Sequence, residues 1–168
     1  MLVTLQEAKE YLKLDPSSTL EDGMLQLFIQ TAQEEMEMLH GRKFEFNEVS
    51  GGAVVPHEEV LSGPGDTQLF LKHYPVYRVL EVARISPDGT AEVIPPSNYQ
   101  LDPQRGVLYG QWFQGVQNYR VKYEGGYVTP DRQPPSGLEY EPEPLPNHLK
   151  MECLEKVAYL YENRQGKR

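Results

Sequence analysis

The sequence predicts an α+β fold that is mainly helical, in which helices from the two ends of the chain pack together. Apolar residues recur at three- and four-residue steps near both ends, as in amphipathic helices. The middle of the chain instead holds short apolar runs separated by turn residues, which is typical of a small antiparallel β-sheet. The expected domains are a helical core of residues 1–43 and 145–168, an inserted antiparallel β subdomain of residues 44–128, and a Pro-rich acidic arm or linker of residues 129–144.

Two helices are predicted before the sheet. Thr4 and Glu7 have the spacing of a capping box at the start of a short helix. Ser18–Glu21 and Thr19–Asp22 offer two overlapping caps for a long helix over residues 20–39, which Gly41 ends. The apolar stripe expected to face the core is Leu25, Phe28, Ala32, Met36 and Leu39. The polar residues expected largely outside are Gln26, Gln33, Glu34 and Glu37.

A third helix is predicted at the end of the chain. Pro146 suits its first turn, and Gly166 is expected to end it. Glu152 and Lys156 lie four residues apart on an outer face, in the order that favours an ion pair. The face expected to be buried holds Leu149, Cys153, Leu154, Val157, Ala158 and Tyr161.

Seven short strands are expected between the helices, with turn residues between most of them. They are residues 58–62, 68–71, 79–85, 91–94, 99–102, 106–109 and 119–124, the last ending at a double glycine, and the Gly51–Gly52 region is expected to be a loop. The run from Thr129 to Pro146 has six prolines and four acids, so it predicts a mobile arm with few apolar anchors.

Composition limits the classes of function. The formal net charge is −9 and the pI is about 4.9, which argues against a protein that binds nucleic acid by neutralising phosphates. A single cysteine excludes an internal disulfide and favours a reducing compartment. No apolar run approaches the roughly 20 residues of a membrane span, and the first residues do not resemble a signal peptide. The protein is therefore expected to be cytosolic when made.

No pattern of catalytic, cofactor-binding or metal-binding residues is found. His40, His57, His73 and His148 do not have the spacing of metal ligands, so each is expected to be a surface or structural residue. Cys153 lies on an apolar helix face and is expected to be a core thiol. Neighbouring acids in the sequence do not share a helix face, which gives little support to catalysis by paired carboxylates.

Aromatic residues and one arginine suggest a protein interface. Tyr127, Tyr159, Tyr161 and Arg164 belong to residue types that are enriched at interfaces. The alternative for Arg164 is a solvated cation at a helix end, where the helix dipole favours it. Trp112-Phe113, in a loop between two glycines, could be part of an interface or a plug over the sheet.

Several stretches, taken in order, resemble the head–tail connector proteins of tailed phages, also called DNA-packaging adaptors. They are Thr4–Leu12, Leu20–Asp22 before a long helix that ends at His40–Arg42, His73–Val76, Asn98–Asp102, Gly106–Leu108, Val121–Tyr127, Leu145–Pro146 and Leu160–Arg164. The acidic, Pro-rich segment before the last helix departs from the family, which has a shorter link there.

The resemblance implies a structural virion protein, not an enzyme. It implies a ring of identical chains beneath the portal protein that extends the DNA channel and receives a tail-side stopper or tail protein. DNA would pass through without sequence-specific binding, no membrane would be involved, and the chain would be made in the cytoplasm of the bacterial host. The candidate interface residues are Tyr123, Gly125, Gly126, Tyr127, Tyr159, Tyr161, Glu162 and Arg164; the candidate lumen-facing residues are Glu34, Glu37, Asp66 and Asp88.

Two other classes of function remain open on the sequence. One is a monomeric cytosolic protein-binding module that uses a sheet edge or the Pro-rich arm to hold a peptide. The other is a hydrolase that uses an aspartate or glutamate. A connector is expected to form multimers, a binding module to stay monomeric, and an enzyme to lose activity when one acid is replaced.

Overall fold

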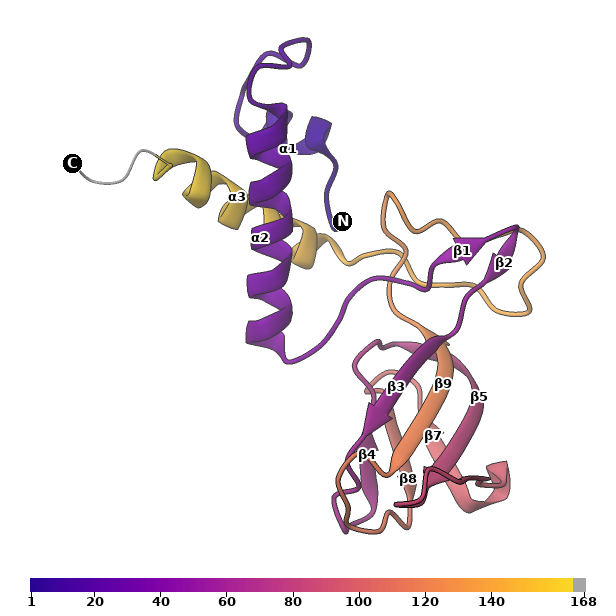
Figure 1. Ribbon diagram of the computed structural model, residues 1–168. Helices are drawn as coiled ribbons and strands as arrows, with labels where there is room; N and C mark the ends of the chain where they lie inside the picture. Colours follow the sequence, from indigo (N-terminus) through magenta and orange to yellow (C-terminus); the bar gives the residue numbers. More distant parts are fainter. Residues whose placement is uncertain (165–168) are drawn as a thin grey trace. The chain divides into compact units, whose positions relative to one another are not determined.

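The computed structural model describes residues 1–164 (Figure 1). The chain divides into two compact units. The helical unit consists of Met1–Arg42, Thr129–Asp131 and the segment from Pro144 onward. The β unit consists of Lys43–Val128 and Arg132–Glu143. The acidic Pro-rich segment is therefore shared between the two units.

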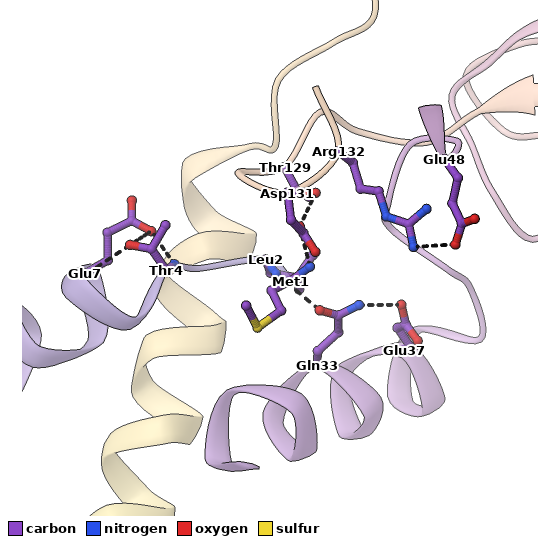
Figure 2. Close-up of polar contacts among 10 residues, drawn as sticks. All are labelled: Met1, Leu2, Thr4, Glu7, Gln33, Glu37, Glu48, Thr129, Asp131 and Arg132. Atoms are coloured by element: carbon purple, nitrogen blue, oxygen red, sulfur yellow. Dashed lines mark hydrogen bonds and ion pairs between the residues drawn. The ribbon is translucent and has the colours of Figure 1, made fainter. Parts of the chain in front are cut away.

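The helical unit contains α1 (Leu5–Tyr11), α2 (Asp22–His40) and α3 (Asn147–Glu162). The capping box predicted at α1 is confirmed: the Glu7 N–H donates to Thr4 Oγ1 at 3.1 Å, and the Thr4 N–H donates to a Glu7 carboxylate oxygen at 2.8 Å (Figure 2). Gly41 ends α2 in the left-handed conformation, with φ of 63°, as predicted. The caps predicted for α2 are wrong, because Glu21 occupies the N-cap position without a side-chain hydrogen bond.

Packing of α2 against α3 forms much of the core of the helical unit (Figure 1). On α2 the buried apolar residues are Leu25, Ile29, Ala32 and Met36, and on α3 they are Leu149, Cys153, Leu154 and Val157. The stripe predicted for α2 is therefore right at Leu25, Ala32 and Met36 and wrong at Phe28 and Leu39, and it omitted Ile29. Ile29 is fully buried, Phe28 is only half-buried, and Leu39 is 72% exposed. An apolar stripe with a period of 3.6 residues fits either assignment, and the contact with α3 decides between them.

Polar contacts hold the helical unit around its core. Gln33 accepts from the Leu2 N–H at 3.2 Å and donates to Glu37 at 3.2 Å, while the Met1 ammonium binds Asp131 at 2.6 Å (Figure 2). The predicted pair of Glu152 with Lys156 does not form. Instead Glu152 binds His40 at 3.0 Å and Lys156 binds Glu35 at 3.5 Å. Both contacts link α3 to α2, so they favour the helix–helix packing.

The β unit contains three antiparallel sheets. The first is a hairpin of β1 (Val49–Ser50) and β2 (Ala53–Val54). The second has the order β3-β9-β5-β6, formed by His57–Leu61, Tyr119–Gly125, Val76–Ile85 and Ala91–Val93. The third has the order β4-β8-β7, formed by Gln68–Phe70, Val107–Gly110 and Tyr99–Asp102. A short 3₁₀ helix, η1 (Pro96–Asn98), precedes β7.

The larger two sheets share one hydrophobic core. Its buried members are Leu69, Leu71, Val76, Val82, Leu108, Trp112, Tyr119, Val121 and Tyr123. Trp112 donates its indole N–H to the Leu108 carbonyl at 2.9 Å and packs edge-on against Tyr119. Trp112 therefore covers the sheet, which is one of the two alternatives predicted for it from the sequence. The neighbouring Phe113 is 50% exposed.

The expectation of a mainly helical protein is wrong. Helix accounts for 27% of the chain and strand for 29%, in three sheets rather than one small one. All seven predicted strands are present and paired antiparallel. The loop expected at Gly51–Gly52 is instead the two-residue turn of the β1–β2 hairpin, in which both glycines have positive φ.

The part of the Pro-rich segment in the β unit, Arg132–Glu143, is called the strap here. The Tyr140 ring stacks on Tyr77 with centroids 5.0 Å apart, and its hydroxyl donates to the buried Glu124 at 2.6 Å. The Glu143 N–H donates to the Tyr77 hydroxyl at 2.8 Å. Tyr140, which anchors the strap with both its ring and its hydroxyl, was not singled out from the sequence.

Replacing Tyr140 with phenylalanine is expected to loosen the strap. The ring can still stack on Tyr77, but the buried Glu124 carboxylate loses one donor and retains Arg78, at 3.0 Å. Leaving a buried acceptor short of a partner costs about 1–3 kcal/mol, so local opening should become more frequent. The measurement is the rate of limited proteolysis within residues 132–143. The matched control is Glu139→Gln on the neighbouring 90% exposed side chain; equal cleavage of both variants would contradict the anchor.

Candidate interaction surfaces

The described residues offer little for catalysis. Within residues 1–164 no group of three or more His, Cys, Asp and Glu side chains is placed to hold a metal ion. Cys153 is fully buried, and burial raises the pKa of its thiol to about 12, so it stays protonated and unreactive at neutral pH. None of the helices in this part of the chain is long and apolar enough to cross a membrane.

Three of the candidate interface residues lie inside the β unit. Tyr123 is fully buried, and its hydroxyl accepts from the His73 N–H at 3.0 Å. Gly125 and Gly126 are also buried, and a Cβ added to either would lie 2.6 Å or less from a backbone carbonyl oxygen. Gly126 has φ of 99°, which glycine adopts without strain. These residues hold β9 to the segments beside it and present no side chain to a partner.

Tyr127 is half-buried and exchanges two backbone hydrogen bonds with the chain that enters the β unit. Its N–H donates to the Phe44 carbonyl at 2.7 Å, and its carbonyl accepts from the Phe46 N–H at 2.8 Å. The segments by which the chain enters and leaves the β unit are therefore hydrogen-bonded to each other. Tyr127 contributes mainly its backbone to that pairing.

The other four candidate interface residues lie at the end of α3. The Tyr161 hydroxyl donates to Glu21 at 2.6 Å, and Arg164 binds the same carboxylate at 3.4 Å with its guanidinium 3.8 Å from the Tyr161 ring centroid. The hydrogen bond to Glu21 raises the pKa of Tyr161. Tyr159 is 68% exposed, and Glu162 is exposed as well. Of the eight candidates, these four are the ones whose side chains a partner could reach most readily.

The four candidate lumen-facing residues have different surroundings. Glu34 is exposed on α2, whereas Glu37 is 8% exposed, which contradicts its expected place on the outer polar face. Asp66 and Asp88 are exposed but also cap turns, since each accepts from the N–H two residues later at 2.9 Å. Hydrogen bonds from Thr90 lower the pKa of Asp88.

A cluster of titratable side chains in the β unit was not foreseen from the sequence. The rings of His57 and His73 stack with centroids 3.6 Å apart, and both lie near Tyr123. His57 Nε2 donates to the Gly125 carbonyl at 3.1 Å, and His73 Nδ1 donates to the Glu45 carbonyl at 3.1 Å. Burial lowers the pKa of His57 to about 4. Because the two histidines are far apart in the sequence, only the sheet topology brings them together.

A second unforeseen feature is the surface around Arg84 and Phe113, called the Arg84 surface here. The Arg84 guanidinium carbon lies 4.6 Å from the Phe113 ring centroid. Two shallow hollows of about 450 and 510 Å³ both have Arg84 in their walls. Val93 and Phe113 border the first hollow and Val116 the second, and these side chains are 60%, 50% and 88% exposed.

Comparison with solved structures finds the fold in phage-like particles. A chain of the neck of an empty GTA particle, computed with C6 symmetry, superposes with a TM-score of 0.66 at 13% identity. A chain of the virion of a native gene transfer agent (GTA) particle superposes with a TM-score of 0.64, also at 13% identity. Each match covers 99% of this chain and 81% of the other. At this identity the likeness shows a shared fold.

Sequence comparisons add no relative. No protein-family model matches the chain. No curated protein matches it either.

Proposed function

We propose that this protein is a structural component of the neck of a phage-like particle, where it forms a ring beneath the portal. The observation that supports this most strongly is the fold shared with a chain of a GTA neck over 99% of the present chain. Both units take part in that match, so the likeness does not rest on one common motif. The resemblance to head–tail connectors points to the same role.

The proposed ring extends the DNA channel and offers a docking surface to a tail-side stopper or tail protein. The C6 symmetry of the neck to which the matching chain belongs supports a ring of several copies. DNA passes through without sequence-specific binding, in keeping with the net charge of −9. The protein is made in the bacterial host and ends in the particle.

Electron microscopy of the purified protein, alone and mixed with portal protein, tests this function. We expect closed rings, or rings that form on the portal. A protein that stays monomeric in both samples and binds one peptide partner at a fixed stoichiometry would instead favour the binding-module alternative.

Within this function, we propose that Glu34, Asp66 and Asp88 face the channel and keep DNA weakly held. Repulsion between fixed carboxylates and phosphates is screened by salt over roughly 8–10 Å. Replacing Glu34 with lysine is expected to create a salt-dependent DNA contact and to slow DNA release from particles. Asp66→Asn and Asp88→Asn remove charge while keeping the turn-capping oxygen, so their effects on DNA affinity report charge alone.

The measurement is DNA affinity of the assembled ring at several salt concentrations, together with the rate of DNA ejection. The matched control is Glu155→Lys, which reverses the charge of an exposed acid on α3. If Glu34→Lys and Glu155→Lys assemblies bind and release DNA alike, the placement of Glu34 in the channel is wrong.

A further inference from the structure

The Arg84 surface combines a cation that forms no ion pair among the described residues with exposed apolar side chains, and Glu92, opposite Arg84 on β6, borders the first hollow. Within residues 1–164 no carboxylate lies within ion-pair distance of Arg84, and its guanidinium lies over the Phe113 ring. Three other arginines of the β unit, Arg78, Arg120 and Arg132, are each bound to a glutamate, in a chain with 25 acids and 16 basic residues. A guanidinium that is held on an aromatic ring keeps its donors available for a carboxylate from outside.

The loop that carries Phe113 is held in place although its side chain is exposed. The Phe113 N–H donates to the Tyr119 hydroxyl at 2.9 Å, and the Phe113 carbonyl accepts from the Asn118 amide at 3.1 Å. Asn118 in turn accepts from the Gly63 N–H at 2.7 Å. An exposed aromatic side chain on a loop fixed in this way loses little conformational entropy on binding, which favours an interface role.

The strap presents a complementary surface on the same chain. Tyr140 points toward Tyr77, while Glu139 is 90% exposed and Glu141 is exposed. Glu139 faces Arg78 only at 4.0 Å, and that guanidinium is already bound to Glu124 at 3.0 Å. The strap therefore offers two available carboxylates next to Leu138 and Pro142, in a segment without helix or strand.

We propose that the Arg84 surface binds the strap of a second copy of this chain, with Glu139 and Glu141 on Arg84 and the apolar neighbours in the two hollows. The contact joins two different surfaces of identical chains. Such a heterologous contact is the kind that closes into a ring when the rotation between copies permits. The inference rests on the proposed ring and names the residues that would join its subunits.

Charge reversal tests the contact in the full-length protein. The readout is self-association, measured by sedimentation velocity and mass photometry up to the highest soluble concentration. Arg84→Glu and the pair Glu139→Lys with Glu141→Lys are each expected to weaken self-association by about tenfold or more, because each places like charges together. The protein with all three substitutions is expected to recover most of the loss.

The matched control is Arg105→Glu. Arg105 is an exposed arginine of the same unit, and its backbone N–H donates to Asp102. This variant is expected to associate like the wild type. Fluorescence of Trp112, the single tryptophan, checks that each variant keeps a folded β unit. Phe113→Ala provides a second variant of the same surface without a change of charge, and it too should weaken association.

Photo-crosslinking identifies the occupant. With p-benzoylphenylalanine in place of Phe113, mass spectrometry should find the adduct on residues 136–143 of another copy. Three results would each overturn the contact: a wild type that stays monomeric at every concentration both alone and with portal protein, Arg84→Glu protein that associates normally, or a triple variant no better than the single. Rings that persist in Arg84→Glu protein would leave the neck function standing and refute only this contact.

Discussion

Replacing Val157 with aspartate is expected to unfold the helical unit. Val157 is 1% exposed on the face of α3 that contributes to the core with α2. A carboxylate buried there without a partner costs several kcal/mol, which is comparable with the roughly 5–15 kcal/mol that stabilises a typical domain. Loss of the three helices should lower the far-ultraviolet circular dichroism at 222 nm and remove its cooperative melting transition.

The matched control lies two residues further along the same helix. Tyr159 is 68% exposed, so Tyr159→Asp introduces the same charge into α3 without burying it. This variant should melt within a few degrees of the wild type, as surface substitutions usually do. If Val157→Asp melts like Tyr159→Asp, the packing described for α3 is wrong.

Local sequence patterns predicted the ends of helices well where a residue or a short motif has a single structural role. The Thr4–Glu7 box and Gly41 were confirmed, since a reciprocal cap and a left-handed helix end depend on neighbouring residues alone. The N-cap of α2 failed because Ser18 and Thr19 were equally good candidates, and the helix begins beyond both.

The extent of the strands was harder to predict. Strand β5 runs from Val76, three residues earlier than expected, and register shifts near Val76 and Val79 interrupt its pairing with β9. The first shift breaks the alternation of apolar and polar residues, so the pattern is recognisable in the sequence only from Val79. The helices, with longer and more regular patterns, were given too much weight, which produced the mistaken expectation of a mainly helical fold.

Candidate surfaces were the least predictable part. The sequence pointed to tyrosines by composition, but burial depends on pairing between distant segments. Tyr123 became a core residue because β3 and β5 pair with β9 on both sides. Arg84 and Phe113 lie 29 positions apart (113 − 84), on a strand and a loop, and no local pattern links them.

Because of His57, the free energy of unfolding of the β unit is expected to decrease as the pH falls from about 6.5 to about 4. Burial lowers the pKa of His57 in the folded protein to about 4, from an ordinary value of 6.5. Between these values the unfolded chain binds a proton that the folded chain does not, so the free energy of unfolding decreases as the pH falls. A difference of about 2.5 pKa units corresponds to about 3 kcal/mol at most.

Other groups around His57 modify this dependence. Arg132 disfavours the charged imidazole, whereas Glu48 favours it. The pKa of Glu59 is raised by burial, so its protonation stabilises the folded state as the pH falls and partly offsets the loss. The His73 ring stacks on the His57 ring, so protonation of His57 would place a positive charge directly against His73. Comparison of two proteins that differ only at His57 removes these shared contributions.

His57→Gln provides that comparison, because the glutamine amide can still donate to the Gly125 carbonyl but does not titrate. The measurement is urea unfolding followed by Trp112 fluorescence, which reports on the β unit, at several pH values between 4 and 7. The wild type should lose about 3 kcal/mol more than His57→Gln over this range, whatever the variant costs at pH 7. His148→Gln, at an exposed histidine of the helical unit, should keep the wild-type dependence. Parallel curves for the wild type and His57→Gln would show that the stacked, half-buried imidazole is not what makes the β unit sensitive to acid.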